Sequence, residues 1–140
     1  MSKSISNKIV LSKTEDILNK FFQAWQNKDW DSMGDVCQVS WTKFIKEPVN
    51  DRLIKWFGDK KLTAYHLYGG EDLTERTNKD LEKAKQTIRF EALYKVKTSI
   101  EYILFGQKYR AKVFINVVSE NGELGVNPST VLREQNRMKM

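Results

Sequence analysis

Cysteine and histidine are scarce in this sequence, and long apolar runs are missing from it. The one cysteine, Cys37, cannot form an internal disulfide, which suits a reducing compartment. The one histidine, His66, lies far from Cys37, and together they do not make a zinc ligand set. Gly69-Gly70 lacks the further glycines and the Lys-Ser/Thr of a phosphate loop. We therefore expect no metal and no cofactor.

The apolar stretches are too short for a signal peptide or a membrane span, so we expect neither, and we expect a cytoplasmic location by default. Basic residues are numerous, with 24 Lys and Arg against 18 Asp and Glu, for a formal charge of +6. Such a charge can attract nucleic acid or an acidic partner. The basic residues are nevertheless mixed with acidic ones and form no block, and none of the common nucleic-acid motifs is present. A solvated lysine-rich surface is the favoured interpretation, and nucleic acid is not expected as a partner.

Three helices are predicted in the first half of the chain. The first begins at Ser12, because Ser12-Lys13-Thr14-Glu15 has the spacing of a capping box. A shorter helix follows, capped by Asp29 or Asp31, and a third begins at Pro48 and ends at Gly58. The apolar stripe of the first helix consists of Ile17, Leu18, Phe21, Phe22 and Trp25.

From Leu62 onward the pattern becomes that of strands. Residues 62–68 predict a first strand that Gly69-Gly70 ends, and residues 71–86 predict a loop with at most one helical turn. Residues 88–104 alternate between apolar and polar without a slip, which predicts a long half-buried strand. The residues of that strand expected to face inward are Ile88, Phe90, Ala92, Tyr94, Val96, Thr98, Ile100, Tyr102 and Leu104.

Two turns predict the register of the sheet. Gly106-Gln107 is interpreted as a type II′ hairpin loop. In the pairing that this loop produces, every inward residue of one strand lies opposite an inward residue of the other. Asn121-Gly122 is interpreted as a type I′ turn that places Val126 opposite Val117. The first hairpin then pairs Phe105 with Lys108 and Glu101 with Lys112.

The order of these elements predicts an α+β fold, with three N-terminal helices packed on a strongly bent antiparallel sheet. A length of 140 residues suits one domain with one core. We expect residues 1–11 to form an N-terminal arm, residues 12–133 to form that domain, and residues 134–140 to form a frayed polar tail.

The chain resembles the NTF2-like, or cystatin-like α+β, superfamily from about Ser12 to Leu132. The resemblance rests on Phe21-Phe22-Gln23-Ala24-Trp25 in the first helix and Asp29-Trp30-Asp31-Ser32-Met33 opening the second. It also rests on the hairpin that ends in Ser119-Glu120-Asn121-Gly122-Glu123-Leu124-Gly125-Val126. It implies a cone-shaped domain, and because the superfamily includes isomerases, dehydratases, cyclases, transport adaptors and secretion-system domains, it implies no single activity.

Enzymes of this superfamily place an Asp, His or Tyr inside the cone as acid or base, so the inward face indicates whether catalysis is expected. It contains no strand carboxylate, since Glu91 and Glu101 fall on the opposite face. Tyrosine is a poor base near neutral pH, and His66 has no nearby acid to orient it. We therefore expect no catalytic residue. The side chains that could line a ligand pocket are Tyr65, His66, Tyr68, Tyr94, Thr98 and Tyr102.

The outer face of the hairpin is unusually apolar for a monomer. Because domains with this fold commonly pair sheet to sheet, the resemblance implies a homodimer through this face; the alternative is that the ends of the hairpin curl and cover these residues. The residues concerned are Leu93, Ile103, Phe105, Phe114 and Val118.

The leading hypothesis is a non-catalytic, dimeric binding or adaptor module, with a small apolar ligand or another protein as further partners. A second is a small-molecule-binding protein or an isomerase-, dehydratase- or cyclase-like enzyme that uses the cone pocket with His66 or a tyrosine. A third is a nucleic-acid-associated protein that uses Lys95, Lys97 or Arg110.

Overall fold

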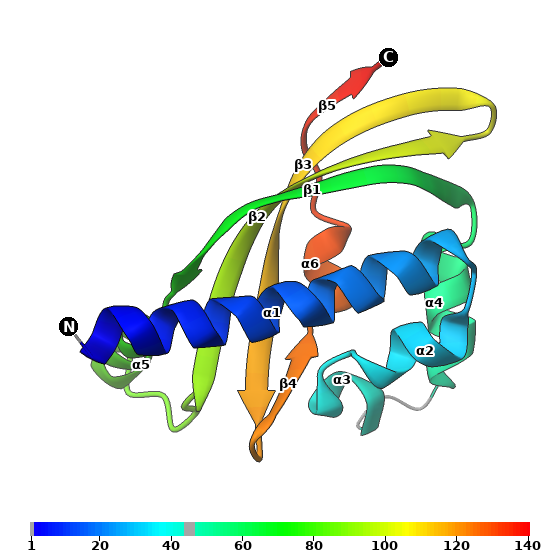
Figure 1. Ribbon diagram of the computed structural model, residues 1–140. Coiled ribbons are helices and arrows are strands. Elements are labelled where there is room, and N and C mark those ends of the chain that lie inside the picture. Colours follow the sequence, from blue (N-terminus) through cyan, green and yellow to red (C-terminus); the bar gives the residue numbers. More distant parts are fainter. Residues whose placement is uncertain (1, 44–46) are drawn as a thin grey trace.

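The protein has an α+β fold in which helices pack against a curled antiparallel sheet (Figure 1). The computed structural model describes residues 2–43 and 47–140. The described residues form six helices: α1 (Ser2–Gln26), α2 (Trp30–Asp35), α3 (Val39–Lys43), α4 (Val49–Phe57), α5 (Thr74–Lys83) and α6 (Pro128–Val131). They also form five strands: β1 (Lys60–Asp72), β2 (Ala92–Leu104), β3 (Gln107–Glu120), β4 (Glu123–Val126) and β5 (Gln135–Lys139).

The long helix α1 lies across the inner face of the sheet (Figure 1). Its predicted apolar stripe is confirmed, because Leu18, Phe21, Phe22 and Trp25 are buried in the core. The predicted start at Ser12 is wrong: α1 begins at Ser2, so the capping-box residues and most of the expected N-terminal arm lie within the helix. Met1, the first residue of that arm, lies outside the described residues.

The two other predicted helices, α2 and α4, follow α1. A helix that was not predicted, α3, lies between them. Asp29 caps α2 as expected, accepting a 3.2 Å hydrogen bond from the Ser32 amide. Pro48 is the N-cap of α4 rather than its first helical residue, and Gly58 is its C-cap. The unpredicted α3 makes four helices before the sheet instead of three. The buried Arg52 joins α4 to α3 by donating a 2.8 Å hydrogen bond to the Trp41 carbonyl.

The long β2–β3 hairpin forms with a different turn from the one predicted. Leu104 pairs with Gln107, so the two loop residues are Phe105 and Gly106, both with positive φ as a type I′ turn requires. The register therefore differs from the prediction by two residues, and an even shift leaves every side chain on its expected face. Glu101 faces Arg110 instead of Lys112, with 2.6 Å between the Arg110 Nη2 and the Glu101 Oε1.

At the far end of β3 the prediction is confirmed. Asn121 and Gly122 form the turn, and Val117 faces Val126 on β4. The strand β4 pairs with one end of β3, and β5 pairs with the other end of the same edge. The predicted frayed tail at residues 134–140 is therefore wrong, because Tyr109 pairs with Lys139 and the C-terminal segment extends the sheet.

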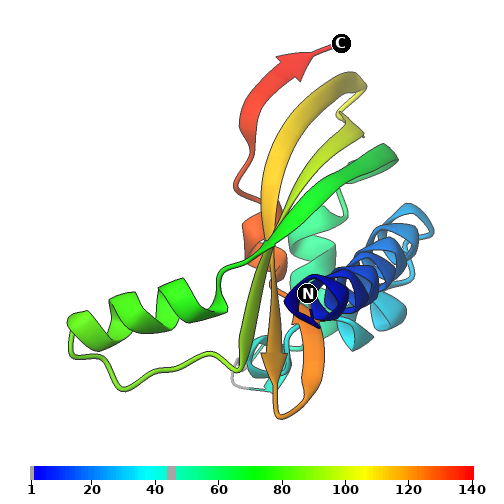
Figure 2. The same cartoon turned by 60° about the vertical axis from the view of Figure 1, so that its left-hand side comes forward.

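The first strand is longer than predicted. Gly69-Gly70 does not end it, and β1 runs from Lys60 to Asp72 with irregular register at 62–64 and 67–69 that bends it. The predicted loop after it contains α5, which buries no side chain and projects from the side of the sheet opposite α1 (Figure 2). The strand β2 begins at Ala92, so Ile88 and Phe90 precede it.

The two faces of the β2–β3 hairpin differ as the alternation predicts. Even residues of β2 and odd residues of β3 pack with α1 in one core, and the intervening residues face away from it. On the outer face, Lys95 and Lys97 are exposed and Phe114 is half-buried.

Candidate binding groove on the outer face of the sheet

The residues predicted to line an inner pocket are divided between the two faces of the sheet. Tyr94, Thr98 and Tyr102 lie on the inner face and are buried, with exposed fractions of 8%, 0% and 0%. Tyr65 is half-buried there, its ring stacked on Phe22 with centroids 4.5 Å apart, and its hydroxyl hydrogen-bonds to Asn19 at 2.9 Å. These four side chains are therefore part of the core packing.

His66 and Tyr68 lie on the outer face instead. Both are exposed, and their rings meet edge to face with centroids 4.5 Å apart. The alternation of β1 explains this separation, because Tyr65 faces the core and its neighbour His66 must face away from it. Only Tyr68 of the six predicted residues reaches a groove that the structure shows on this face.

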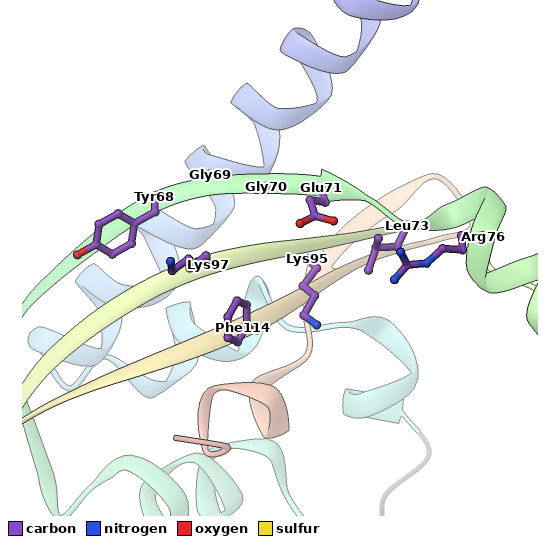
Figure 3. Close-up of a pocket in the computed structure, with 9 residues that line it drawn as sticks. All are labelled: Tyr68, Gly69, Gly70, Glu71, Leu73, Arg76, Lys95, Lys97 and Phe114. Atoms are coloured by element: carbon purple, nitrogen blue, oxygen red, sulfur yellow. The ribbon is translucent and has the colours of Figure 1, made fainter. Parts of the chain in front are cut away.

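That groove, here called the outer groove, has a volume of about 420 Å³ and lies where β1, the start of α5, β2 and β3 meet (Figure 3). Its size falls within the range of small-ligand sites. Its lining residues are Tyr68, Gly69, Gly70, Glu71, Leu73, Arg76, Lys95, Lys97 and Phe114.

The sheet register brings the lining residues into two rows. Lys97 pairs with Phe114, and the bulge in β1 places Tyr68 on the other side of Lys97. In the next row, Glu71 pairs with Lys95. Because successive strands supply each row, residues far apart in the sequence become neighbours across the sheet.

Cations outnumber carboxylates in the outer groove. Arg76, Lys95 and Lys97 line it with a single acid, Glu71. Within the described part of the chain, none of the three cations lies within 4.0 Å of a carboxylate oxygen. Two of them lie over aromatic rings: the Lys95 Nζ is 5.0 Å from the Phe114 centroid and the Lys97 Nζ is 5.6 Å from the Tyr68 centroid. Three cations against one carboxylate, with no ion pair between them, make this groove suited to an anion.

A second, smaller groove of about 170 Å³ adjoins the outer groove, sharing Lys95 and Phe114 with it. We call it the side groove. It adds one more exposed cation, Arg133, which follows α6. Its other lining residues are Asn116, Thr130 and Gln135.

The predicted dimer face is less exposed than the sequence indicates. Leu93 and Val118 are buried, with exposed fractions of 7% and 4%, which corrects their expected exposure. The chain itself covers Leu93, because the start of α5 bonds to it: the Leu93 amide donates to the Thr74 Oγ1 at 2.9 Å. Ile103 is half-buried, and Phe105 is 86% exposed because it forms the hairpin turn.

A cluster of polar residues that no pattern in the sequence indicates lies near the hairpin end of the sheet. The Tyr102 hydroxyl donates a short hydrogen bond to Glu134, and the Lys60 Nζ lies 3.3 Å from the other oxygen of that carboxylate. Arg137 lies over the Tyr109 ring, 4.1 Å from its centroid. Burial, together with the hydrogen bond to Glu134, raises the pKa of the Tyr102 hydroxyl. A hydroxyl held neutral in this way does not serve as a base near neutral pH.

Cys37 is also unsuited to act as a nucleophile. Its thiol is buried and donates to the Met33 carbonyl at 3.3 Å, and burial raises its pKa to about 12. The reactive form of cysteine is the thiolate, which is scarce under these conditions. Across residues 2–43 and 47–140, no three His, Cys, Asp or Glu side chains are grouped so that they could hold a metal ion.

No protein-family model matches this chain, and no curated protein matches it either. In the described portion of the molecule, no helix combines the length and the apolar character that crossing a membrane requires.

Proposed function

We propose that this protein is a non-catalytic binding module that holds an anionic partner on the outer face of its sheet. The observation that carries the proposal is the outer groove, where Lys95 and Lys97 lie over aromatic rings, Arg76 adds a third cation, and none of the three forms an ion pair with a carboxylate of the described residues. Opposite charge at such a groove raises the local concentration of an anion and the rate at which it binds.

We further propose that the fold is an NTF2-like cone. Support comes from the curled antiparallel sheet, which has α1 across one face, and from the β2–β3 hairpin with β4 at its end (Figure 1). In this proposal the inner face serves packing, and the outer face carries the binding site.

An enzyme of the isomerase, dehydratase or cyclase type is supported less well. The tyrosines on the inner face are buried, and burial raises the pKa of Tyr94 as well as that of Tyr102. His66, the other candidate base, lies exposed on the outer face beside Tyr68. Binding without catalysis requires none of these groups to exchange a proton.

A homodimer through the outer face is a competing proposal. The half-buried Ile103 and the exposed Phe105 favour it, because both offer apolar surface near the hairpin turn. Charge opposes it, since a face carrying Lys95 and Lys97 would meet the same lysines of a second copy. An anionic partner satisfies those charges, so we favour it.

Binding of long-chain inorganic polyphosphate, measured by calorimetry at low and high salt, tests the proposed function. We expect salt-sensitive binding that the double variant Lys95→Glu/Lys97→Glu weakens by about tenfold or more, because two attractive charges become repulsive. The matched control is Lys13→Glu/Lys20→Glu, which changes the net charge equally at exposed positions on α1. Equal losses in the two double variants would show that only net charge matters and would contradict the proposed site.

A further inference from the structure

Two aromatic side chains lie in the same row of the outer groove, one on each side of Lys97 (Figure 3). Tyr68 belongs to β1 and Phe114 to β3, so the two rings are separated by two strand spacings, or about 10 Å. Tyr68 is 56% exposed and Phe114 is half-buried. Rings that stand on an open sheet surface can stack with planar groups of a ligand.

Cations line the outer groove beside these rings and continue into the side groove. Arg76 reaches toward the strands from α5, Lys97 lies between the two rings, and Lys95 lies over Phe114 (Figure 3). Arg133 continues the series in the side groove. These four cations are all exposed, so each can move to meet a charged group of the ligand. The ligand that this arrangement fits is extended, with several negative charges and planar groups between them.

Glu71 is the one acid among the lining residues of the two grooves, and its position limits how much it weakens the attraction of an anion. It pairs across the strands with Lys95, so it reduces the attraction of that lysine most and leaves Lys97, Arg76 and Arg133 positive. An anion of high charge density, such as a chain of phosphates, still gains more from the cations than it loses to one carboxylate.

We propose that the anionic partner is single-stranded nucleic acid, with bases stacked on Phe114 and Tyr68 and phosphates held by Arg76, Lys95, Lys97 and Arg133. This inference rests on the proposed function, which requires only an anion. Single strands are favoured over a duplex because a duplex keeps its bases stacked on one another, so the two rings would have no base to bind. Single-stranded nucleic acid is favoured over an acidic peptide because the carboxylates of a peptide would pair with the cations but would offer no base to stack on the two rings.

Fluorescence anisotropy with labelled twelve-residue oligothymidylate and oligouridylate tests the inference. The variants Phe114→Leu and Tyr68→Leu keep an apolar side chain and remove the ring. Each is expected to weaken binding about tenfold, since base–ring stacking contributes about 1–3 kcal/mol and 1.4 kcal/mol is a factor of ten. Phe105→Leu is the matched control, because it removes an exposed ring of the same hairpin outside both grooves.

The salt dependence gives a second readout. Four cations that each neutralise one phosphate predict that the logarithm of the association constant falls with the logarithm of salt concentration with a slope of about −3. Lys95→Gln should reduce that slope by about 0.7, and Lys20→Gln on α1 should leave it unchanged. Tyr68 is largely exposed, so Tyr68→Leu tests the rings even if Phe114→Leu fails to fold.

The outcomes distinguish this inference from the proposed function. Oligonucleotide binding that needs both rings and exceeds binding of a duplex supports it. If polyphosphate, poly-glutamate or a duplex of equal length binds as tightly as the oligonucleotide, and the ring variants bind like wild type, the inference is wrong while the proposed anion site stands. If neither oligonucleotide nor polyphosphate binds, both are wrong.

Discussion

At Gly125 the backbone of β4 passes directly against the residues between α2 and α3. A Cβ atom on Gly125 would lie 2.5 Å from the Gln38 Cα and 2.6 Å from the Gln38 nitrogen. Hydrogen bonds fix this approach on both sides, since the Gln38 amide donates to the Val126 carbonyl and the Val126 amide donates to the Val36 carbonyl, each at 2.8 Å. Glycine is therefore the residue that lets the helical layer attach to β4.

Gly125→Ala should lower the free energy of unfolding by about 3 kcal/mol, because backbone atoms must move to make room. The matched control is Gly34→Ala in α2, whose Cβ would meet mainly the Val49 side chain, 2.9 Å from its Cγ1. That side chain can rotate, and alanine favours a helix by up to about 1 kcal/mol, so a change within about 1 kcal/mol is expected. Urea denaturation of the two variants provides the comparison. Equal effects would contradict this account of Gly125.

The Cys37 thiol gives the protein a pH dependence in the alkaline range. Its pKa is raised from 9.0 to about 12 by burial, so above pH 9 the unfolded chain loses the thiol proton while the folded chain keeps it. Stability should therefore fall between pH 9 and 12, by up to about 1.4 kcal/mol per pH unit from this group. Cys37→Ala should show a shallower decline over that range in chemical denaturation at stepped pH. Parallel declines would mean that the thiol is not the titrating group.

At the scale of elements, β5 is held to the body of the protein by the Tyr102–Glu134–Lys60 contacts as well as by backbone pairing with β3. The side chains of the strand itself are exposed, so they add little burial. The hydrogen bond between Tyr102 and Glu134 is mostly shielded from water, because the Glu134 side chain is 11% exposed. Hydrogen bonds to a charged group in such a site contribute more than exposed ones.

A double-mutant cycle with Tyr102→Phe and Glu134→Gln should give a coupling energy of about 1.5–3 kcal/mol in the free energy of unfolding. The comparison is a cycle with Glu101→Gln and Arg110→Gln on the outer face, where the Arg110 side chain is 51% exposed. That pair should couple by at most about 1 kcal/mol, because water and salt screen it. A larger coupling in the exposed pair would overturn the role assigned to the buried contact.

The sequence predicts an element well where the element buries an apolar stripe and poorly where it does not. The helix α1 and the β2–β3 hairpin both show such a stripe, so both were predicted. The helix α5 buries no side chain, and β5 forms by backbone pairing, so neither leaves an apolar pattern to find. The turn was misplaced by one residue because Phe105 takes a positive φ that bulky residues rarely adopt, and alternation cannot detect a register shift of two.

The outer groove could be predicted only in part for a related reason. Alternation places Lys95, Lys97 and Phe114 outward together, which the sequence shows. Arg76 and Tyr68 join them through the unpredicted α5 and the bulge in β1, which depend on tertiary packing. The sequence therefore showed the cations without showing that they share one site.

At the scale of the whole molecule, the formal charge of +6 is partly gathered on one face of the sheet. Like charges on a shared face repel a second copy, so we expect the chain to have its monomer mass of 16.4 kDa in light scattering at low salt. Twice that mass, reduced to the monomer value by Phe114→Glu, would support the homodimer instead. Phe105→Glu at the turn distinguishes association through the hairpin end from association through the groove.

The pairing of β5 at the edge of β3 determines how the protein responds to force. The bonds that hold β5 lie one after another along the strand, starting at the C-terminus, where the Met140 amide donates to the Lys108 carbonyl at 2.9 Å. A force that pulls the C-terminus away from the sheet acts on one of these hydrogen bonds at a time. The bonds therefore break in order from Met140 toward Glu134, whose side-chain contacts are the last to carry the force. Tension on a tethered C-terminus would thus release β5 before it disrupts the core between α1 and the long hairpin.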